Sequence, residues 1–170
     1  LRGATLVMIN HGITTGALFI GVGIIYERLH TRDLAQAAGM GKFMPIFSFF
    51  LGAFCLSSMA FPGSNSFIGE FLVMAGGFSV AKLLMLFTIP GIVAAAAYNL
   101  RMLQKVAYGS TNNPDHSGVA DLNLREVATL VPLFVFVLWI GFHPQPFLDL
   151  MQTSVDQVVH HVGRATTALR

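Results

Sequence analysis

Long apolar runs dominate this sequence and set what it can fold into. The first is "GATLVMINHGITTGALFIGVGIIY", residues 3–26, and similar runs begin near residues 44, 83 and 125. A helix of about 20 mostly apolar residues crosses a bilayer core roughly 30 Å thick. Hydrophobic residues make up 54% of the chain and charged residues 11%, whereas an average soluble domain has roughly 25% charged residues. The sequence therefore predicts an all-α, polytopic transmembrane helix bundle.

The runs divide the chain into two parts. We expect residues 1–143 to form four transmembrane helices, with the second broken near residues 62–66 and the third kinked at Pro90. Residues 144–170 are predicted to form an amphipathic surface helix and a tail, because this segment is too polar to span a bilayer. Its apolar residues recur at helical spacing: Phe147, Leu148, Met151, Val155, Val158, Val159 and Val162.

Lysines and arginines indicate how the helices are oriented. With four spans, the loops at residues 27–42 and 101–125 lie on the same side of the membrane. Their basic residues are Arg28, Arg32, Lys42, Arg101, Lys105 and Arg125. Because basic residues accumulate in cytoplasmic loops, we expect this side to face the cytoplasm.

Composition also excludes several classes of site. Cys55 is the only cysteine, so the chain can hold neither an intrachain disulfide nor a cysteine-ligated Fe–S cluster. The net charge is +2 and no basic stripe alternates with aromatic residues, so no nucleic-acid partner is expected. The sequence starts at Leu1 inside an apolar run, without a basic region and cleavage site. We therefore expect no signal peptide and expect the chain to be part of a longer protein.

The segment "AFPGSNSFIGEF", residues 60–71, interrupts the second apolar run. Pro62 lacks a backbone donor, and Gly63 and the polar residues up to Ser66 are poor helix formers. At membrane depth, backbone freed in this way is tolerated only inside protein or beside a water-filled cavity. Interrupted helices recur in membrane proteins that handle ions. Pro62, Gly63 and Asn65 are therefore predicted to form a helix break at a functional site.

Two titratable residues lie inside the predicted spans. Glu70 follows the break by about one turn, and a charge at the bilayer centre costs about 2.5–3.5 kcal/mol. His11 lies in the first span, and a histidine titrates near neutral pH and passes protons in either direction. The functional hypothesis is that Glu70 and His11 belong to one proton path. The structural alternative is that both side chains only satisfy neighbouring backbone groups.

Two further patterns predict local structure. Gly12 and Gly16 have the spacing that lets a second helix approach closely in a membrane. Asn123 and Glu126 have the spacing of a capping box at the start of the fourth span.

Three segments together resemble a known family. They are "NHGITTGALFIGVGIIYERLHTRD", "FPGSNSFIGEF" and "LREVATLVPLFVFVLWIGFHPQPFLDLM". They are similar, in order and spacing, to the chain M (chain-four) type of antiporter-like subunit of bacterial NADH-quinone oxidoreductase, respiratory complex I. The resemblance covers essentially the whole sequence and corresponds to the last four transmembrane helices of a longer chain, plus its C-terminal amphipathic helix.

The resemblance implies a fold of inverted helical repeats, each with one discontinuous helix. Glu70 matches a glutamate at the outward end of the family's proton path, and His11 matches a histidine of its central polar axis. The implied function is proton translocation by a membrane subunit of an enzyme whose electron transfer occurs in other subunits. FMN, Fe–S clusters and quinone are implied in those subunits, with no cofactor or redox centre on this chain.

The resemblance also implies a location and partners. The chain would be a multi-pass protein of the bacterial inner (cytoplasmic) membrane, in contact with lipid and with other membrane-arm subunits, especially neighbouring antiporter-like chains. Two alternatives remain open. The chain could belong to a multisubunit cation/proton antiporter or a membrane-bound hydrogenase, or it could be a purely structural membrane subunit.

Overall fold

The computed structural model describes residues 1–110 and 118–168. Helices account for most of this part of the chain, and it contains no β-strand. The elements are α1 (Arg2–Leu29), η1 (Met40–Lys42), α2 (Pro45–Ser58), α3 (Asn65–Val80), α4 (Lys82–Leu86), α5 (Thr88–Tyr108), α6 (Leu124–Phe142) and α7 (Gln145–Ala168). The end of the predicted C-terminal tail, residues 169–170, lies outside the described residues.

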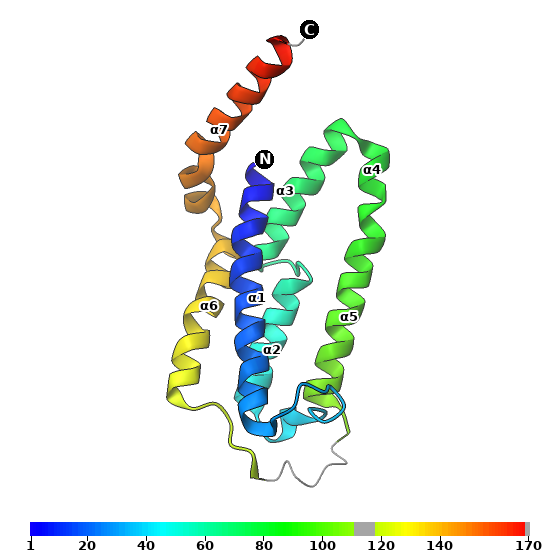
Figure 1. Ribbon diagram of the computed structural model, residues 1–170, viewed down its shortest axis with the longest axis vertical. Coiled ribbons are helices and arrows are strands. Elements are labelled where there is room, and N and C mark those ends of the chain that lie inside the picture. The colour runs from blue at the N-terminus through cyan, green and yellow to red at the C-terminus, as the bar shows by residue number, and fades with distance from the viewer. Residues whose placement is uncertain (111–117, 169–170) are drawn as a thin grey trace.

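The helices form an elongated bundle with two distinct ends (Figure 1). At one end, which we call the loop end, lie the connection from α1 to α2 and the connection from α5 to α6. At the other, the terminal end, lie the N-terminus, the turn from α3 to α4 and the start of α7. Helices α2 and α3 follow one another end to end along the bundle, with the interruption about midway.

Three described helices are long and apolar enough to cross a membrane: Arg2–Leu29, Lys82–Tyr108 and Leu124–Phe142. The second predicted span is carried by two shorter helices, α2 and α3, separated by residues 59–64. The chain is therefore an all-α, multi-pass transmembrane bundle with one discontinuous helix. The interruption starts earlier than expected and is over by Asn65, which is the first residue of α3.

The third span, Lys82–Tyr108, has a local irregularity near its start, at Phe87 between α4 and α5. Pro90 has no backbone N–H, so the carbonyl of Leu86 cannot receive the usual i to i−4 bond from it. The helical ladder ends at Leu86 and begins again at Thr88. The proline thus acts on the helix one turn before its own position.

At the loop end, a residue distant in sequence caps α2. Helix α2 starts with Pro45, which has no donor, and the next two backbone N–H groups point away from the helix. Asp121 accepts both of them, from the N–H of Ile46 at 2.8 Å and from the N–H of Phe47 at 3.1 Å. The start of α2 is therefore held by the loop that leads into α6.

An ion pair joins the same region to α1. Arg28 donates to both carboxylate oxygens of Glu126, at 2.9 and 2.8 Å, and also to the carbonyls of Ala120 and Asp121. The two charged side chains are only 14% and 8% exposed. The predicted capping box is confirmed, because the Asn123 side chain and Glu126 exchange bonds with each other's backbone. Glu126 therefore caps α6 and anchors α1 at once.

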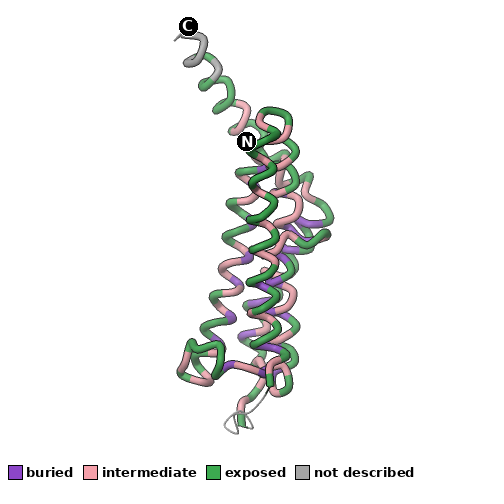
Figure 2. Tube along the Cα trace, turned by 90° about the vertical axis from the view of Figure 1, so that its right-hand side faces the viewer, coloured by how far each residue is buried: buried purple, intermediate pink, exposed green. Residues whose placement is uncertain are grey.

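The apolar core occupies the half of the bundle nearer the loop end, as the buried residues in Figure 2 show. It combines large side chains of α2 with residues of α1, η1, α5 and α6. Its members include Ala17, Ile24, Met40, Met44, Phe47, Phe50, Phe54, Val106, Leu130 and Val137. The second half of α3, all of α4 and the first half of α5 are mostly exposed within this chain.

Helix α7 extends past the terminal end of the bundle (Figure 1). It contacts the start of α1 through an exposed ion pair, Arg2 to Asp156 at 3.2 Å. Its predicted apolar face is partly covered: Phe147, Leu148, Met151 and Val155 are half-buried, whereas Val158, Val159 and Val162 are 53%, 50% and 60% exposed. Whether this helix lies along a membrane surface remains a prediction.

Close packing of α6 against the helix interruption gives a first testable prediction. A Cβ added at Gly141 would meet the backbone of the interruption, including the Gly63 carbonyl carbon at 2.7 Å and the Ser64 carbonyl carbon at 2.8 Å. We expect Gly141→Ala to destabilise the protein by about 1–3 kcal/mol, because neither backbone can yield cheaply. The apparent melting temperature of the purified protein in detergent measures this.

Gly76→Ala is the matched control, because a Cβ at Gly76 has open space around it. That change should be neutral or stabilising by up to about 1 kcal/mol, the helix preference of alanine over glycine. Equal melting temperatures for the two variants would contradict the proposed packing role of Gly141.

Candidate functional site

The backbone of the interruption is hydrogen-bonded in a defined pattern. Ala60 donates to the Ser57 carbonyl and Phe61 donates to the Leu56 carbonyl, both at 3.0 Å. Ala60 is left-handed, with φ 54°. These two bonds and this conformation make up a Schellman motif, which closes the C-terminus of α2. Alanine here takes a position at which glycine is the usual residue.

A ring of polar side chains joins the two halves of the broken helix to α1. Ser57 donates to Asn65 Oδ1 at 2.6 Å, and the Thr14 and Ser57 hydroxyls lie 2.8 Å apart. Asn65 Nδ2 in turn lies 3.5 Å from Thr14 Oγ1. All three residues are at most 2% exposed. The end of α2, the start of α3 and the middle of α1 are therefore fixed to one another.

Counting protons assigns the donors in this ring. A serine hydroxyl has one proton, and that of Ser57 is used toward Asn65. Thr14 must therefore donate to Ser57, and Asn65 Nδ2 donates to Thr14. The bonds run in one direction around the ring, which lets each of the three side chains both donate and accept.

Asn10 extends the ring along α1. Its Nδ2 donates to the backbone carbonyl of Asn65 at 2.7 Å, and its backbone carbonyl accepts from Asn65 Nδ2 at 3.4 Å. Asn10 Oδ1 is buried and has no protein partner among the described residues. It is the kind of acceptor that a buried water satisfies.

A glycine lets α1 and α3 come together beside the ring. A Cβ at Gly69 would lie 2.8 Å from Val7 Cγ2 and 3.3 Å from Asn10 Nδ2. By contrast, no described atom lies within 4 Å of a Cβ at Gly12 or Gly16, so the close approach predicted for these two glycines is not found within the described residues. Gly69 immediately precedes Glu70, and its contact with α1 brings that carboxylate next to the face of α1 that carries His11.

Glu70 and His11 line the same cavities. One is a small cavity of about 70 Å³. It is lined by Val7, Asn10, His11, Thr14, Thr15, Ser58, Ser66 and Glu70. At roughly 30 Å³ of liquid volume per water, this space holds about two molecules and offers the several polar partners that each needs. Within this chain Glu70 is partly buried and His11 is exposed.

A larger cavity of about 540 Å³ also reaches both residues. It lies between α1, α2 and α5 and extends to the loop end, where Thr31 and Arg32 line it. Asn99 of α5, which is 3% exposed, contributes a polar group to its wall. No cluster of three or more His, Cys, Asp or Glu side chains suited to a metal ion occurs among the described residues.

The sequence singled out some members of this site and missed others. Pro62 and Gly63 lie in the interruption, and Asn65 opens α3 as a buried member of the ring. Ser57 and Asn99 were missed, because single polar residues in apolar helices have no spacing signal. Their partners come from helices that only the fold brings together.

Comparisons with known proteins identify relatives of the chain. The family described as "NADH:quinone oxidoreductase/Mrp antiporter, TM" matches residues 1–96. NADH-ubiquinone oxidoreductase chain 4 of Marchantia polymorpha is 38% identical over 161 residues, which is 95% of this chain and 32% of that protein. NADH-quinone oxidoreductase subunit M of Rhodobacter capsulatus is 34% identical over 168 residues, 98% of this chain and 33% of that protein.

A solved structure has a fold similar to that of this chain. A chain of respiratory complex I from Thermus thermophilus with bound NADH matches with a TM-score of 0.79 and 27% identity, covering 85% of this chain and 30% of that chain. The similarity to subunit M that the sequence motifs indicated is thus confirmed. The chain spans about a third of the length of the relatives it matches.

The polar ring gives the second prediction. Ser57→Ala removes one donor and one acceptor and leaves buried groups of Thr14 and Asn65 without partners. We expect a loss of stability of about 1–3 kcal/mol, the usual cost of an unsatisfied buried polar group. The apparent melting temperature should fall, and hydrogen exchange of the amides in residues 59–64 should become faster.

Ser79→Ala is the control, because Ser79 is exposed and bonds only the carbonyl of Gly76 in its own helix. Its effect should stay within about 0.5 kcal/mol. If Ser57→Ala leaves both the melting temperature and the exchange of residues 59–64 at the level of Ser79→Ala, the ring does not hold the interruption together.

Proposed function

Because the chain belongs to the NADH:quinone oxidoreductase/Mrp antiporter family of membrane chains, we propose that it acts in proton translocation within an NADH:quinone oxidoreductase. In this proposal it is part of an antiporter-like membrane subunit of respiratory complex I, in the bacterial inner (cytoplasmic) membrane. Electron transfer in other subunits drives the proton movement.

The observation that carries this proposal is that Glu70 and His11 share two cavities beside a helix interruption. Glu70 is a carboxylate in the middle of a chain with few charges, and His11 is a titratable residue that lines both cavities. A purely structural role for both would place them against backbone groups. No hydrogen bond from either side chain to the backbone is present among the described residues, which supports the functional hypothesis.

The chemistry requires a group that takes up a proton and a route by which it leaves. Glu70 would carry the proton as a carboxylic acid, and His11 would exchange it through water in the small cavity. Hydroxyl groups of Thr15 and Ser66 line that cavity and can donate to or accept from such water. The ring of Thr14, Ser57 and Asn65 would keep α3, and with it Glu70, at a fixed distance from α1.

The proposal places the electron carriers elsewhere. FMN, Fe–S clusters and quinone would lie in partner subunits, which would also include neighbouring antiporter-like chains. Helix α7 supports a docking role at the terminal end, because its apolar residues Leu150, Val158 and Val162 are largely exposed. A neighbouring membrane-arm subunit would cover part of this face.

A second function has to be distinguished experimentally from proton translocation in complex I. A multisubunit cation/proton antiporter or a membrane-bound hydrogenase would use the same broken helix. Purification of the native assembly through this chain distinguishes them. Co-purification of flavin and NADH dehydrogenase activity supports complex I, and their absence from an intact assembly favours the alternatives.

The third prediction concerns Glu70. Glu70→Gln keeps the size of the side chain and part of its hydrogen bonding but removes its titration. The assembled enzyme should form in normal amount, while proton pumping and the electron transfer coupled to it fall several-fold. Pumping is measured in sealed vesicles with a pH-sensitive dye, and electron transfer by NADH oxidation with quinone.

Glu27→Gln is the matched control, since Glu27 is exposed at the end of α1 and lines neither cavity. It should pump at the normal rate. An assembled Glu70→Gln enzyme that pumps as well as Glu27→Gln would show that the role of Glu70 is structural.

A further inference from the structure

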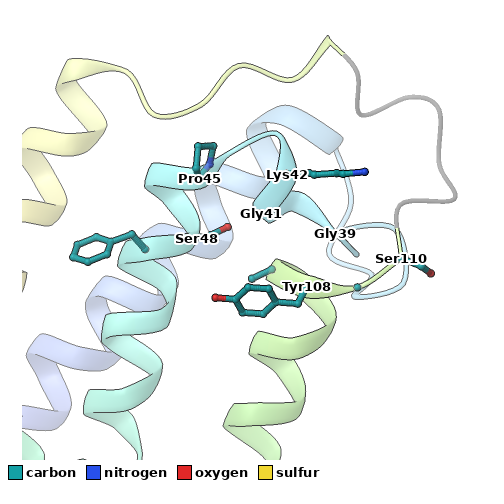
Figure 3. Close-up of a pocket in the computed structure, with 10 residues that line it drawn as sticks. Gly39, Gly41, Lys42, Pro45, Ser48, Tyr108 and Ser110 are labelled. Atoms are coloured by element: carbon teal, nitrogen blue, oxygen red, sulfur yellow. The ribbon is translucent and has the colours of Figure 1, made fainter.

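A cavity of about 830 Å³ lies at the loop end, away from Glu70, and we call it the polar cavity because its lining is more polar than that of the groove beside it. The turn around η1, the start of α2 and the end of α5 surround it (Figure 3). Its lining residues are Gly39, Gly41, Lys42, Pro45, Ser48, Phe49, Ala107, Tyr108, Gly109 and Ser110. Many of these are glycines or other small residues, so the cavity is lined by backbone groups and a few polar side-chain groups.

The cavity has one charged lining residue, Lys42. Lys42 is exposed, lines the cavity and has no acidic partner among the described residues. An exposed lysine next to a transmembrane helix attracts the anionic lipids of the cytoplasmic leaflet.

An apolar groove of about 460 Å³ continues from this cavity toward the helix interruption. The two share Ser48, Phe49 and Tyr108. The remaining walls of the groove are almost entirely apolar and come from α2, the interruption and α6. They are Gly52, Ala53, Leu56, Phe61, Pro62, Gly63, Ser64, Phe134, Val137, Leu138 and Phe142.

Tyr108 marks the level at which polar and apolar surroundings meet. It lines both spaces and is 80% exposed, and tyrosine concentrates at the headgroup level of membranes. In Figure 3 its hydroxyl points toward the region of Ser48 at the start of α2. The polar cavity therefore lies on the headgroup side of Tyr108, and the groove lies on the hydrocarbon side.

The α2 wall of the groove is long enough for a segment of an acyl chain. It runs from Ser48 to Leu56, eight residues apart, which is about 12 Å along a helix. Half of a hydrocarbon core roughly 30 Å thick is about 15 Å, so this wall covers most of that length.

We propose that this surface is a binding site for an anionic phospholipid, with its headgroup in the polar cavity beside Lys42 and an acyl chain in the groove between α2 and α6. The large apolar side chains at the rim favour lipid as the occupant. Phe49, Phe61 and Phe142 are 58%, 54% and 76% exposed, as expected for rings that contact hydrocarbon. A lysine at the interfacial cavity and an apolar groove that continues from it match the two parts of an amphiphile.

The test uses the assembled complex in bilayer nanodiscs with a photoactivatable phosphatidylglycerol that carries a diazirine on its acyl chain. After illumination, mass spectrometry of the digested protein locates the labelled residues. We expect labelling of Leu56, Phe61 and Leu138 to exceed that of Phe19, which is 71% exposed on α1 outside the groove. Equal labelling, or none in the groove because protein covers it, overturns the proposal.

Two pairs of variants separate the headgroup from the acyl chain. Lys42→Gln should lower the preference for phosphatidylglycerol over the matching phosphatidylcholine probe about fivefold, the factor that one basic residue contributes near an anionic surface. Lys82→Gln at the terminal end is its control. Ala53→Trp fills the groove and should abolish labelling there, whereas Ala97→Trp on an exposed position of α5 should not.

The outcome for Lys42 keeps the proposal testable even if Ala53→Trp fails to assemble. If both probes label the groove equally and Lys42→Gln changes neither, no anionic phospholipid is recognised there. Because the labelling does not depend on proton pumping, this result is independent of whether Glu70 carries protons.

Discussion

The fold depends on satisfying the polar groups that the interruption of the second span exposes in the middle of the bundle. Unpaired backbone groups at that depth each cost several kcal/mol, so a helix can stop there only where partners are provided. The Schellman motif at Ala60 and Phe61 closes α2, and the one-directional ring of Thr14, Ser57 and Asn65 ties the start of α3 to α1. Both the position of Glu70 and the cavity that it shares with His11 follow from this arrangement.

The sequence was sufficient for what depends on local pattern. Apolar runs predicted the helices, Pro62 and Gly63 predicted the interruption, and the spacing of Asn123 and Glu126 predicted the start of α6. It was not sufficient for what depends on contacts between distant segments. The cap that Asp121 places on α2 joins residues 75 positions apart, and the bond from Arg28 to Glu126 joins residues 98 apart. No periodicity within one helix contains that information.

The glycines show the same limit. Spacing along α1 predicted that Gly12 and Gly16 let a second helix approach closely, whereas among the described residues close contacts fall on other glycines, such as Gly3, Gly69 and Gly141. A glycine permits close approach wherever a neighbour arrives, and the neighbour's position is set by the whole bundle. The loop end and the interruption are therefore linked. The ion pair and the cap fix α1, α2 and α6 at the loop end, and this alignment brings Gly141, near the other end of α6, against the interruption.

Two residues of the interruption have left-handed backbones, Ala60 with φ 54° and Gly63 with φ 95°, and they differ in stiffness. A left-handed backbone costs an alanine about 1–2 kcal/mol and allows it only a narrow range of φ and ψ. A glycine adopts these angles without that cost. Gly63 therefore has the wider range of backbone angles, while the joint on the α2 side is rigid. A hinge between α2 and α3 would lie at Gly63, where the backbone of α6 at Gly141 packs closely and restricts its movement.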